Sequence, residues 1–125
     1  MTKNKTETKY QGITLKTLVL DNVIFKEIVN SDLKEVDYIY LSANNHLTVK
    51  QIQYLFKLKI DNVNINLLRN PNCHEKEISR FIALNDKIYN IAIAHNSNLS
   101  QKQINELLKF DDLDVNMSLK FNNLL

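Results

Sequence analysis

Hydrophobic and polar residues recur along this chain with a period of 26 residues. An asparagine marks the repeat, because Asn44, Asn70, Asn96 and Asn122 follow one another at that spacing without a gap. Apolar residues fill the columns three and five positions before the asparagine, and three, eight, eleven and twelve positions after it. Self-similarity at a fixed period of this length is typical of a protein built from stacked structural repeats.

Each repeat predicts two helices. The apolar residues after the asparagine recur at i, i+3 and i+4, and therefore lie on one face of a second helix. Capping boxes begin this helix at Thr48 with Gln51 and at Ser100 with Gln103, and His74 holds the capping position in the middle repeat. A shorter first helix precedes the asparagine and is predicted over residues 36–43, 63–69, 88–95 and 115–121.

The repeated asparagine is predicted to have a structural role rather than to bind a ligand. It falls where the first helix must end and the chain must turn toward the next cap. Asparagine tolerates a left-handed backbone conformation, and its amide can hydrogen-bond neighbouring backbone groups. In a stack of repeats the same amide can also reach the adjacent repeat.

No single helix pair can bury its apolar face alone, so neighbouring pairs must stack around one core. The predicted fold is all-α, a short right-handed α-solenoid of about three two-helix repeats with degenerate ends. One domain is predicted over residues 13–125, preceded by a polar tail at 1–12. Its repeats are placed at about 36–61, 62–87 and 88–113, followed by a partial repeat at 114–125.

Two segments resemble a known family. The run 91–108, which combines a helix, an asparagine and a serine-capped second helix, resembles the variant leucine-rich repeat, and so does Leu-Leu-Arg-Asn-Pro at 67–71. More broadly, residues 36–125 resemble the armadillo/HEAT class of helical solenoids. The resemblance implies an α-solenoid that binds other proteins, and it implies no particular chemistry. The unit here is slightly longer than that family's usual one, and proline follows the asparagine only at Pro71.

The N-terminal segment at 13–35 allows two interpretations. Ile24, Phe25 and Ile28 after a capping Asp21 match the second-helix pattern if the repeat changes its length by one residue. Alternatively, two apolar runs flanking Asp21 and Asn22 form a β-hairpin. We favour the degenerate repeat, and in both cases the segment covers the first apolar face.

The C-terminal end also leaves two alternatives. The last repeat stops where its second helix would begin. Either Leu124 and Leu125 fold back over Leu107 and Phe110, or a partner or a second copy covers this apolar end.

Composition agrees with a helical chain and excludes several kinds of site. Gly and Pro occur once each, whereas strand-rich folds need frequent turns and a phosphate-binding loop needs more than one glycine. No apolar run approaches the roughly 20 residues of a membrane span, and the first residues lack a signal-peptide core. A single cysteine, Cys73, forbids an internal disulfide and fits a reducing compartment. We therefore expect a cytoplasmic protein with no membrane partner.

The residue types that carry catalysis or bind metals form no recognisable set. His46, His74 and His95 occupy different columns and form no i, i+4 pair, so no metal site is expected. Cys73 shares an apolar column with two leucines and is predicted to lie in the core rather than to act as a nucleophile. No serine lies in a glycine-flanked elbow. The sequence predicts neither an enzyme nor a cofactor.

Basic side chains share one exposed face of the second helices, at positions six, ten and thirteen after the asparagine. We name the following residues the basic ladder: Lys50, Tyr54, Lys57, Lys76, Arg80, Lys102 and Lys109. Arginine and tyrosine are frequent anchors of protein interfaces, so the ladder is a candidate partner-binding surface. The alternative is an ordinary solvated helix face.

A second candidate surface follows the first helices. We name it the amide row: Tyr38, Asn64, Asn90 and Asn116, with Tyr40, Asn66, Ala92 and Ser118 beside them. Amides in register could hydrogen-bond the extended backbone of a partner. The alternative is that the row only reflects a chain that contains 18 asparagines.

These observations together predict a non-catalytic protein-binding module. Among small, stand-alone domains of bacterial type, an immunity or antitoxin role is the best specific hypothesis: the protein would bind and neutralise a partner toxin or effector. One alternative is nucleic-acid binding through the basic ladder, which a net charge of +2 supports only weakly. Another is a scaffold that forms a homo-oligomer through its C-terminal apolar end.

Overall fold

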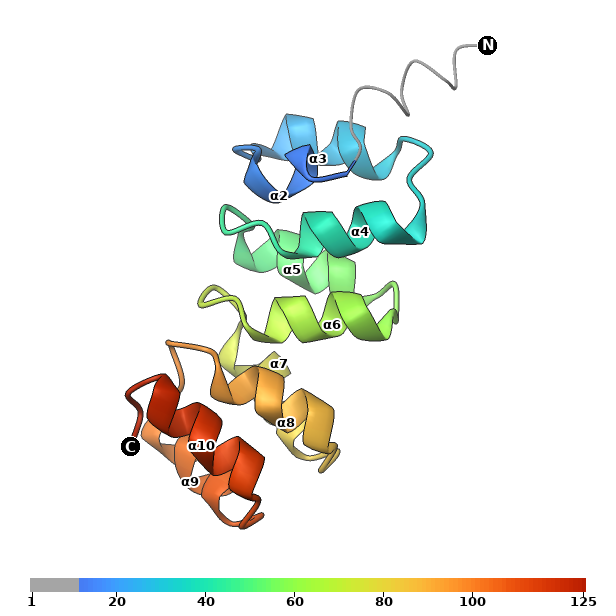
Figure 1. Ribbon diagram of the computed structural model, residues 1–125. Coiled ribbons are helices and arrows are strands. Elements are labelled where there is room, and N and C mark those ends of the chain that lie inside the picture. Colours follow the sequence, from blue (N-terminus) through green and yellow to red (C-terminus); the bar gives the residue numbers. More distant parts are fainter. Residues whose placement is uncertain (1–11) are drawn as a thin grey trace.

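A computed structural model describes residues 12–125, within which all regular structure is helical and no strand occurs (Figure 1). In chain order the helices are α2 (Thr14–Thr17), α3 (Asn22–Val29), α4 (Glu35–Ser42), α5 (Val49–Phe56), α6 (Asp61–Leu68), α7 (Glu75–Ile82), α8 (Lys87–Ala94), α9 (Gln101–Leu108) and α10 (Leu113–Phe121). The prediction of an all-α fold is confirmed.

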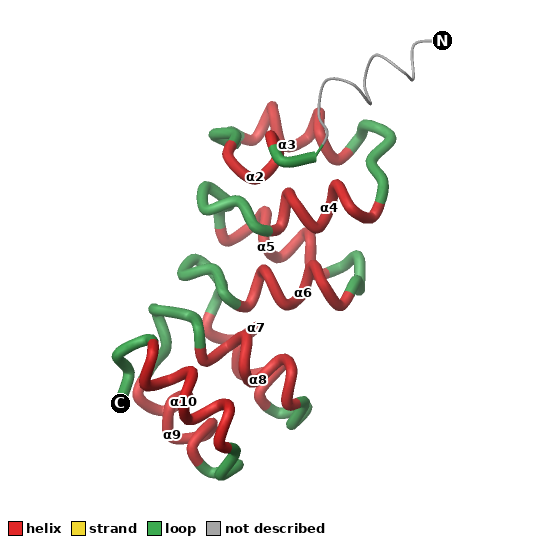
Figure 2. Tube along the Cα trace, viewed as in Figure 1, coloured by secondary structure: helices red, strands yellow, loops and turns green. Residues whose placement is uncertain are grey.

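The helices form pairs that stack into a small α-solenoid. The first helices of the pairs, α2, α4, α6, α8 and α10, contact one another in chain order, and the second helices, α3, α5, α7 and α9, form the other layer. Figure 2 shows that the connecting loops gather along two opposite edges of the stack. The right-handed sense of the superhelix stays a prediction.

The two helices of a repeat have equal length, so the prediction of a shorter first helix is wrong. Helices α4 to α9 each span eight residues. The first helices begin one or two residues earlier than their apolar pattern indicates, and in α8 and α10 an aspartate caps this earlier start. Asp86 shows this arrangement, since its carboxylate accepts hydrogen bonds from the N–H groups of Ile88 and Tyr89.

The N-terminal segment is a degenerate helix pair and not a β-hairpin. Helices α2 and α3 take the places of a first and a second helix, and Asp21 caps α3 by accepting a 2.8 Å hydrogen bond from the N–H of Ile24. Phe25 and Ile28 are buried in the core, as the favoured interpretation requires. Apart from its last residue, Gly12, the predicted polar tail lies outside the described residues.

The predicted capping chemistry is present at all three positions. The N–H of Gln51 donates to Thr48 Oγ1 at 3.2 Å, and the N–H of Thr48 donates back to Gln51 Oε1 at 2.9 Å. Ser100 and Gln103 form the same reciprocal pair. His74 caps α7 through Nδ1, which accepts from the N–H of Lys76 at 3.1 Å.

The repeated asparagines connect each helix pair to the preceding one. We call Asn44, Asn70, Asn96 and Asn122 the asparagine ladder. Asn96 Nδ2 donates to the carbonyl oxygens of Leu68 and Asn70, at 2.8 and 2.9 Å, and the other three amides donate to the preceding pair in the same way. The Oδ1 atoms of the first three accept the N–H two residues further on, which closes the turn. The predicted bridging role is confirmed.

The left-handed backbone conformation lies elsewhere than predicted. No ladder asparagine has a positive φ, whereas Lys59, Asn85 and Asp111 do, at 57°, 53° and 51°. These three residues are also 26 positions apart, at the turn from each second helix into the next first helix. The ladder asparagines close their own turns by side-chain hydrogen bonds instead.

One continuous core runs through the stack, and the column of Leu41, Leu67, Ile93 and Leu119 is fully buried within it. Cys73 also lies in this core, as predicted. At the C-terminal end Leu124 packs against the core, whereas Leu125 stays exposed, so the fold-back holds for one of the two leucines. Among the described helices, none combines the length and apolar character that crossing a membrane requires.

Candidate functional site

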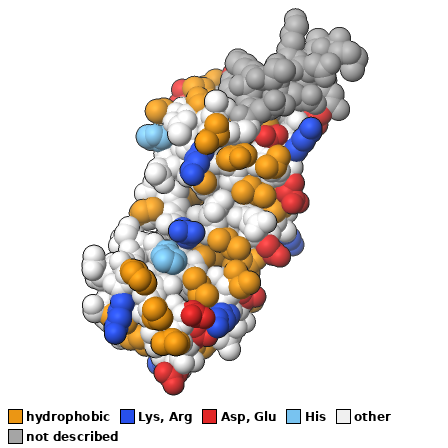
Figure 3. All heavy atoms as spheres, in the orientation of Figure 1, with side chains coloured by type: hydrophobic (Ala, Val, Ile, Leu, Met, Phe, Trp, Pro, Cys, Tyr) orange, Lys and Arg blue, Asp and Glu red, His pale blue; other side chains and the backbone are white. Residues whose placement is uncertain are grey.

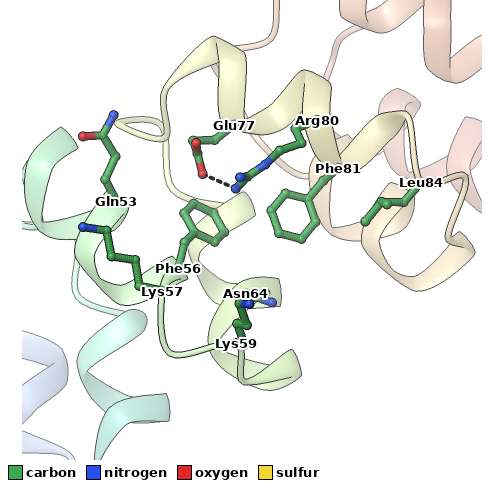
Figure 4. A pocket seen from close by; sticks show the side chains of 9 residues that line it. All are labelled: Gln53, Phe56, Lys57, Lys59, Asn64, Glu77, Arg80, Phe81 and Leu84. Atoms are coloured by element: carbon green, nitrogen blue, oxygen red, sulfur yellow. Dashed lines mark hydrogen bonds and ion pairs between the residues drawn. The ribbon is translucent and has the colours of Figure 1, made fainter.

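Grooves open between successive second helices because these helices are packed less closely than the first helices. One of them, which we call the α5–α7 groove, has a volume of about 590 Å³ (Figure 4). Its lining comes from α5 and its following turn (Gln53, Phe56, Lys57, Lys59), from α6 (Asn64), and from α7 and its following turn (Glu77, Arg80, Phe81, Leu84).

Two phenylalanine rings form an apolar wall of the groove. The centroids of Phe56 and Phe81 are 5.2 Å apart with the rings tilted by 33°, and Figure 4 shows them side by side at its centre. Tyr89 of α8 meets Phe81 edge to face, with centroids 5.1 Å apart. Both phenylalanines are largely buried, so the wall is formed before any ligand arrives.

The charged groups around this wall are mostly basic. The lining includes three basic residues, Lys57, Lys59 and Arg80, and one carboxylate, Glu77. Glu77 pairs with Arg80 at 2.6 Å. The guanidinium of Arg80 also lies 5.6 Å from the Phe81 ring centroid, within cation–π range. Because the Arg80 side chain is 63% exposed, its pair with Glu77 is screened by water and exchanges easily for another carboxylate.

Asn64 contributes a buried amide whose oxygen has no partner. The Tyr89 hydroxyl donates to Asp61 Oδ1 at 2.7 Å, because a carboxylate can only accept. The hydroxyl oxygen then accepts from Asn64 Nδ2 at 3.4 Å, which sets the orientation of the amide. Asn64 Oδ1 is left buried and without a hydrogen bond among the described residues, as are the Oδ1 atoms of Asn90 and Asn116. An unpaired buried acceptor of this kind costs about 1–3 kcal/mol.

The structure brings part of the basic ladder together. Lys57 and Arg80 meet in the α5–α7 groove, from successive second helices. Lys50 and Tyr54 line a second, mainly apolar groove of about 490 Å³ between α3 and α5, where Tyr54 packs edge to face on Phe25 at 5.8 Å. The remaining ladder residues are exposed on α7 and α9 and line neither of these two grooves: Lys76, Lys102 and Lys109.

The amide row does not form one exposed surface, because half of its members are buried and the others are half-buried. Asn64 and Asn90 are only 8% and 2% exposed, Ala92 and Ser118 are buried as well, and Tyr38 is half-buried. These positions face neighbouring helices because the first helices stack closely. Amides of this face serve contacts between repeats, as shown by Asn66 Nδ2, which donates to the Ile39 carbonyl and to Ser42 Oγ, both at 3.1 Å. Of Tyr38, Asn64, Asn90 and Asn116, Asn64 is the residue that lines the α5–α7 groove.

Sequence reasoning missed several groove residues. Phe56 and Phe81 were predicted as core, and the structure shows that they also form a groove wall. The i, i+3 spacing of Glu77 and Arg80 was a signal for their ion pair. Gln53 and Leu84 carry no signal, because their place in the lining depends on the distance between α5 and α7.

The residues considered for catalysis or metal binding are separated. Within residues 12–125, no three His, Cys, Asp or Glu side chains are close enough together to hold a metal ion. Burial, and to a lesser extent the charge of Glu77, raises the pKa of the Cys73 thiol to about 12. The thiol is therefore neutral at physiological pH, as expected of a core cysteine.

The apolar end of the stack is exposed on α10. Leu113, Met117 and Phe121 project into solvent, and Phe121 is 79% exposed. Met117 belongs to the column of Ile39, Ile65 and Ile91, which are partly buried against the core. Self-association through this face stays a prediction.

Comparison with protein-family models, with curated proteins and with solved structures finds no significant match to this chain.

Proposed function

We propose that this protein is a non-catalytic protein-binding module that grips a partner on its second-helix face. The observation that carries the proposal is the α5–α7 groove, which combines a preformed aromatic wall with a basic rim. Aromatic and arginine side chains at the centre of a contact supply most of the binding energy of protein interfaces. Because repeat scaffolds are stiff along the stack, the groove needs little rearrangement to bind.

The chemistry of the groove suits a partner segment with an apolar side chain next to a carboxylate. The apolar side chain would pack on Phe56 and Phe81. The carboxylate would pair with Arg80, in exchange for Glu77, or with Lys57 or Lys59. Lys50 and Tyr54 extend the same face by one repeat, so a longer segment would occupy both grooves.

We further propose that the module is an immunity or antitoxin-type inhibitor acting in the cytoplasm, which neutralises a toxin or effector by covering its active surface. The helical-repeat fold supports the proposed resemblance to variant leucine-rich repeats and to armadillo/HEAT solenoids, whose habit is to bind proteins. A rigid face with anchors from successive repeats is suited to such blocking.

The test is to co-express the protein with each product of the neighbouring genes and to measure binding by calorimetry and protection of growing cells. A partner contacting the groove should bind at least about tenfold more weakly to the double variant Lys57→Ala/Arg80→Ala. Lys120→Ala on α10 is the matched control and should bind normally. Absence of binding and of protection with every neighbour would refute the inhibitor, and unchanged binding by the double variant would refute the groove.

Nucleic-acid binding is the outcome that would replace this proposal. It predicts an affinity for RNA or DNA that falls steeply with salt, because binding releases counterions from phosphates. Neutralising Lys76, Arg80 and Lys102 would then abolish binding.

A further inference from the structure

A polar groove lies at the opposite edge of the stack, at the C-terminal ends of the first helices. We call it the edge groove; it has a volume of about 390 Å³. Side chains that matter for its chemistry come from α2, from the turn after α4, and from α6 and α8: Lys16, Asn45, Asn66, Arg69 and His95. Figure 3 shows Lys and Arg side chains on both sides of the face that it draws, while most acidic side chains lie along its right side.

The basic side chains of the edge groove lack counter-charges. No carboxylate lines the groove in the part of the chain that the structure describes. In that same part, no hydrogen bond or ion pair involves the side chains of Lys16, Asn45, Arg69 or His95. Lys16, Arg69 and His95 each lie at the C-terminal end of their own helix, where a cation is favoured. The stacking of the helices collects these three basic side chains in one hollow without a carboxylate in its lining.

Lys16, Asn45 and Arg69 are exposed at this groove, whereas His95 is partly buried. Partial burial of the imidazole, and next the positive charge of Arg69, lower the pKa of His95 below its ordinary value. At neutral pH the groove thus holds two fixed positive charges, on Lys16 and Arg69, and a neutral imidazole. The Asn45 amide adds two N–H donors. A ligand that balances this set carries two negative charges and several acceptor oxygens.

We propose that the edge groove binds a phosphate-type dianion, paired with Lys16 and Arg69 and hydrogen-bonded by His95 and Asn45. The planar guanidinium of Arg69 matches two phosphate oxygens at once, and Lys16 supplies a point charge. The ligand is inorganic phosphate or the phosphate group of a small monoester, which share this chemistry. The site lies on the edge opposite the α5–α7 groove and does not depend on the proposed function.

The test is a titration of the full chain with inorganic phosphate at constant ionic strength, followed by NMR of the histidine rings and backbone amides. Saturable shifts should be confined to residues around the edge groove. Bound phosphate should also raise the pKa of His95, since a nearby anion favours the imidazolium. Glycerol phosphate, a monoester, should bind at least as tightly as phosphate if the natural ligand is a small phosphorylated molecule, and more weakly if it is phosphate itself.

Matched variants distinguish phosphate binding at the edge groove from a non-specific attraction of phosphate to positive charges. Arg69→Gln and Lys16→Gln should each weaken binding by about tenfold or more, as expected for the loss of a charge-assisted hydrogen bond. Lys34→Gln, at the exposed N-cap of α4, removes the same charge elsewhere and should change nothing. The proposal is overturned if the shifts do not saturate, if Arg69→Gln binds like the unmodified chain, or if glutarate, a dicarboxylate, binds as tightly as phosphate.

Discussion

The side-chain amide of Asn96 donates a 2.9 Å hydrogen bond to the backbone carbonyl of Asn70, its counterpart one repeat earlier. The same amide donates to Leu68, the last residue of α6. Carbonyl groups at the end of a helix lack partners within that helix. Asn96 therefore caps, from the next repeat, the end of a first helix, and Asn122 does the same at Ala94, the last residue of α8. Asn70 instead bonds the carbonyl of Asn44, in the turn after α4.

Replacing a ladder asparagine should destabilise the whole stack. Asn96→Ala leaves the carbonyl of Leu68 and the N–H of Asn98 without their partner, in a site that is 0% exposed. The carbonyl of Asn70 keeps only its hydrogen bond from the N–H of Cys73. We expect a loss of about 2–4 kcal/mol in the free energy of unfolding, measured by urea denaturation. Asn105→Ala, on the exposed face of α9, is the control and should cost less than about 0.5 kcal/mol. Equal losses for the two variants would contradict the capping role.

The left-handed turn offers a stabilising substitution. Lys59 has φ 57°, where a side chain is strained and glycine is not. Lys59→Gly should therefore raise the free energy of unfolding by roughly 0.5–1 kcal/mol. Lys57→Gly, two residues earlier at φ −67°, should lower it, because glycine there only adds freedom to the unfolded chain. Thermal melts of both variants would check the opposite signs.

Core and surface positions of the same helix should respond differently. Leu107 on α9 is fully buried, whereas Lys102 on the same helix is exposed. Leu107→Ala should cost about 2–5 kcal/mol through lost burial and a residual cavity, and Lys102→Ala should be nearly neutral. Urea unfolding followed by circular dichroism would measure both, and a small loss for Leu107→Ala would mean that this repeat is loosely packed.

Asp112 should contribute to stability in a pH-dependent way. Its hydrogen bond from the N–H of Val115, and then the charge of Lys87, hold the pKa of this carboxyl below its ordinary value of 3.8. The ionised form is thus favoured in the folded state, so the contribution is present above pH 3.8 and disappears as the pH falls through the folded-state pKa.

Asp112→Asn should therefore be less stable than the unmodified chain at pH 7, and the gap should close as the pH drops below 3.8. Asparagine keeps the cap of α10, so the comparison isolates the charge. Asp111→Asn is the matched control for the removal of one negative charge. A gap that stays constant down to pH 2 in urea melts would speak against this role of Asp112.

Cys73 should be nearly inert in the folded protein. With a pKa of about 12, only a small fraction of this thiol is ionised at neutral pH, and the side chain is buried as well. We expect a thiol-specific reagent to react at least about a hundredfold more slowly with the native chain than with the chain in urea. Fast reaction under native conditions would show that α7 opens readily.

The repeat could be predicted because burial itself is periodic. Leu41, Leu67 and Ile93 occupy one column and are all fully buried, so the chain repeats the same apolar pattern to build the same contact. The positions of the left-handed turns could also have been predicted from the sequence. Asn85 and Asp111 share a column and belong to the residue types that tolerate this conformation, although the lysine at position 59 obscures the pattern.

The grooves could not be predicted, because a period gives the direction of a side chain but not the distance between helices. The separation of α5 and α7 follows from how large side chains such as Phe56 and Phe81 pack beneath them. The burial of Asn64 and Asn90 was missed for a related reason. Asparagine is usually exposed, and only the close stacking of the first helices places these amides inside.

The asparagine ladder restricts how this molecule can change in length. Each amide reaches a carbonyl that lies one repeat back, so inserting or deleting a whole 26-residue unit at the turns would keep every remaining link intact. An insertion inside a first helix would rotate the amide away from its acceptor. The loops absorb a change of one residue, since Asn44 keeps its link although the caps Asp21 and Thr48 are 27 positions apart. Duplication or deletion of whole repeats therefore adds or removes one asparagine link at each step.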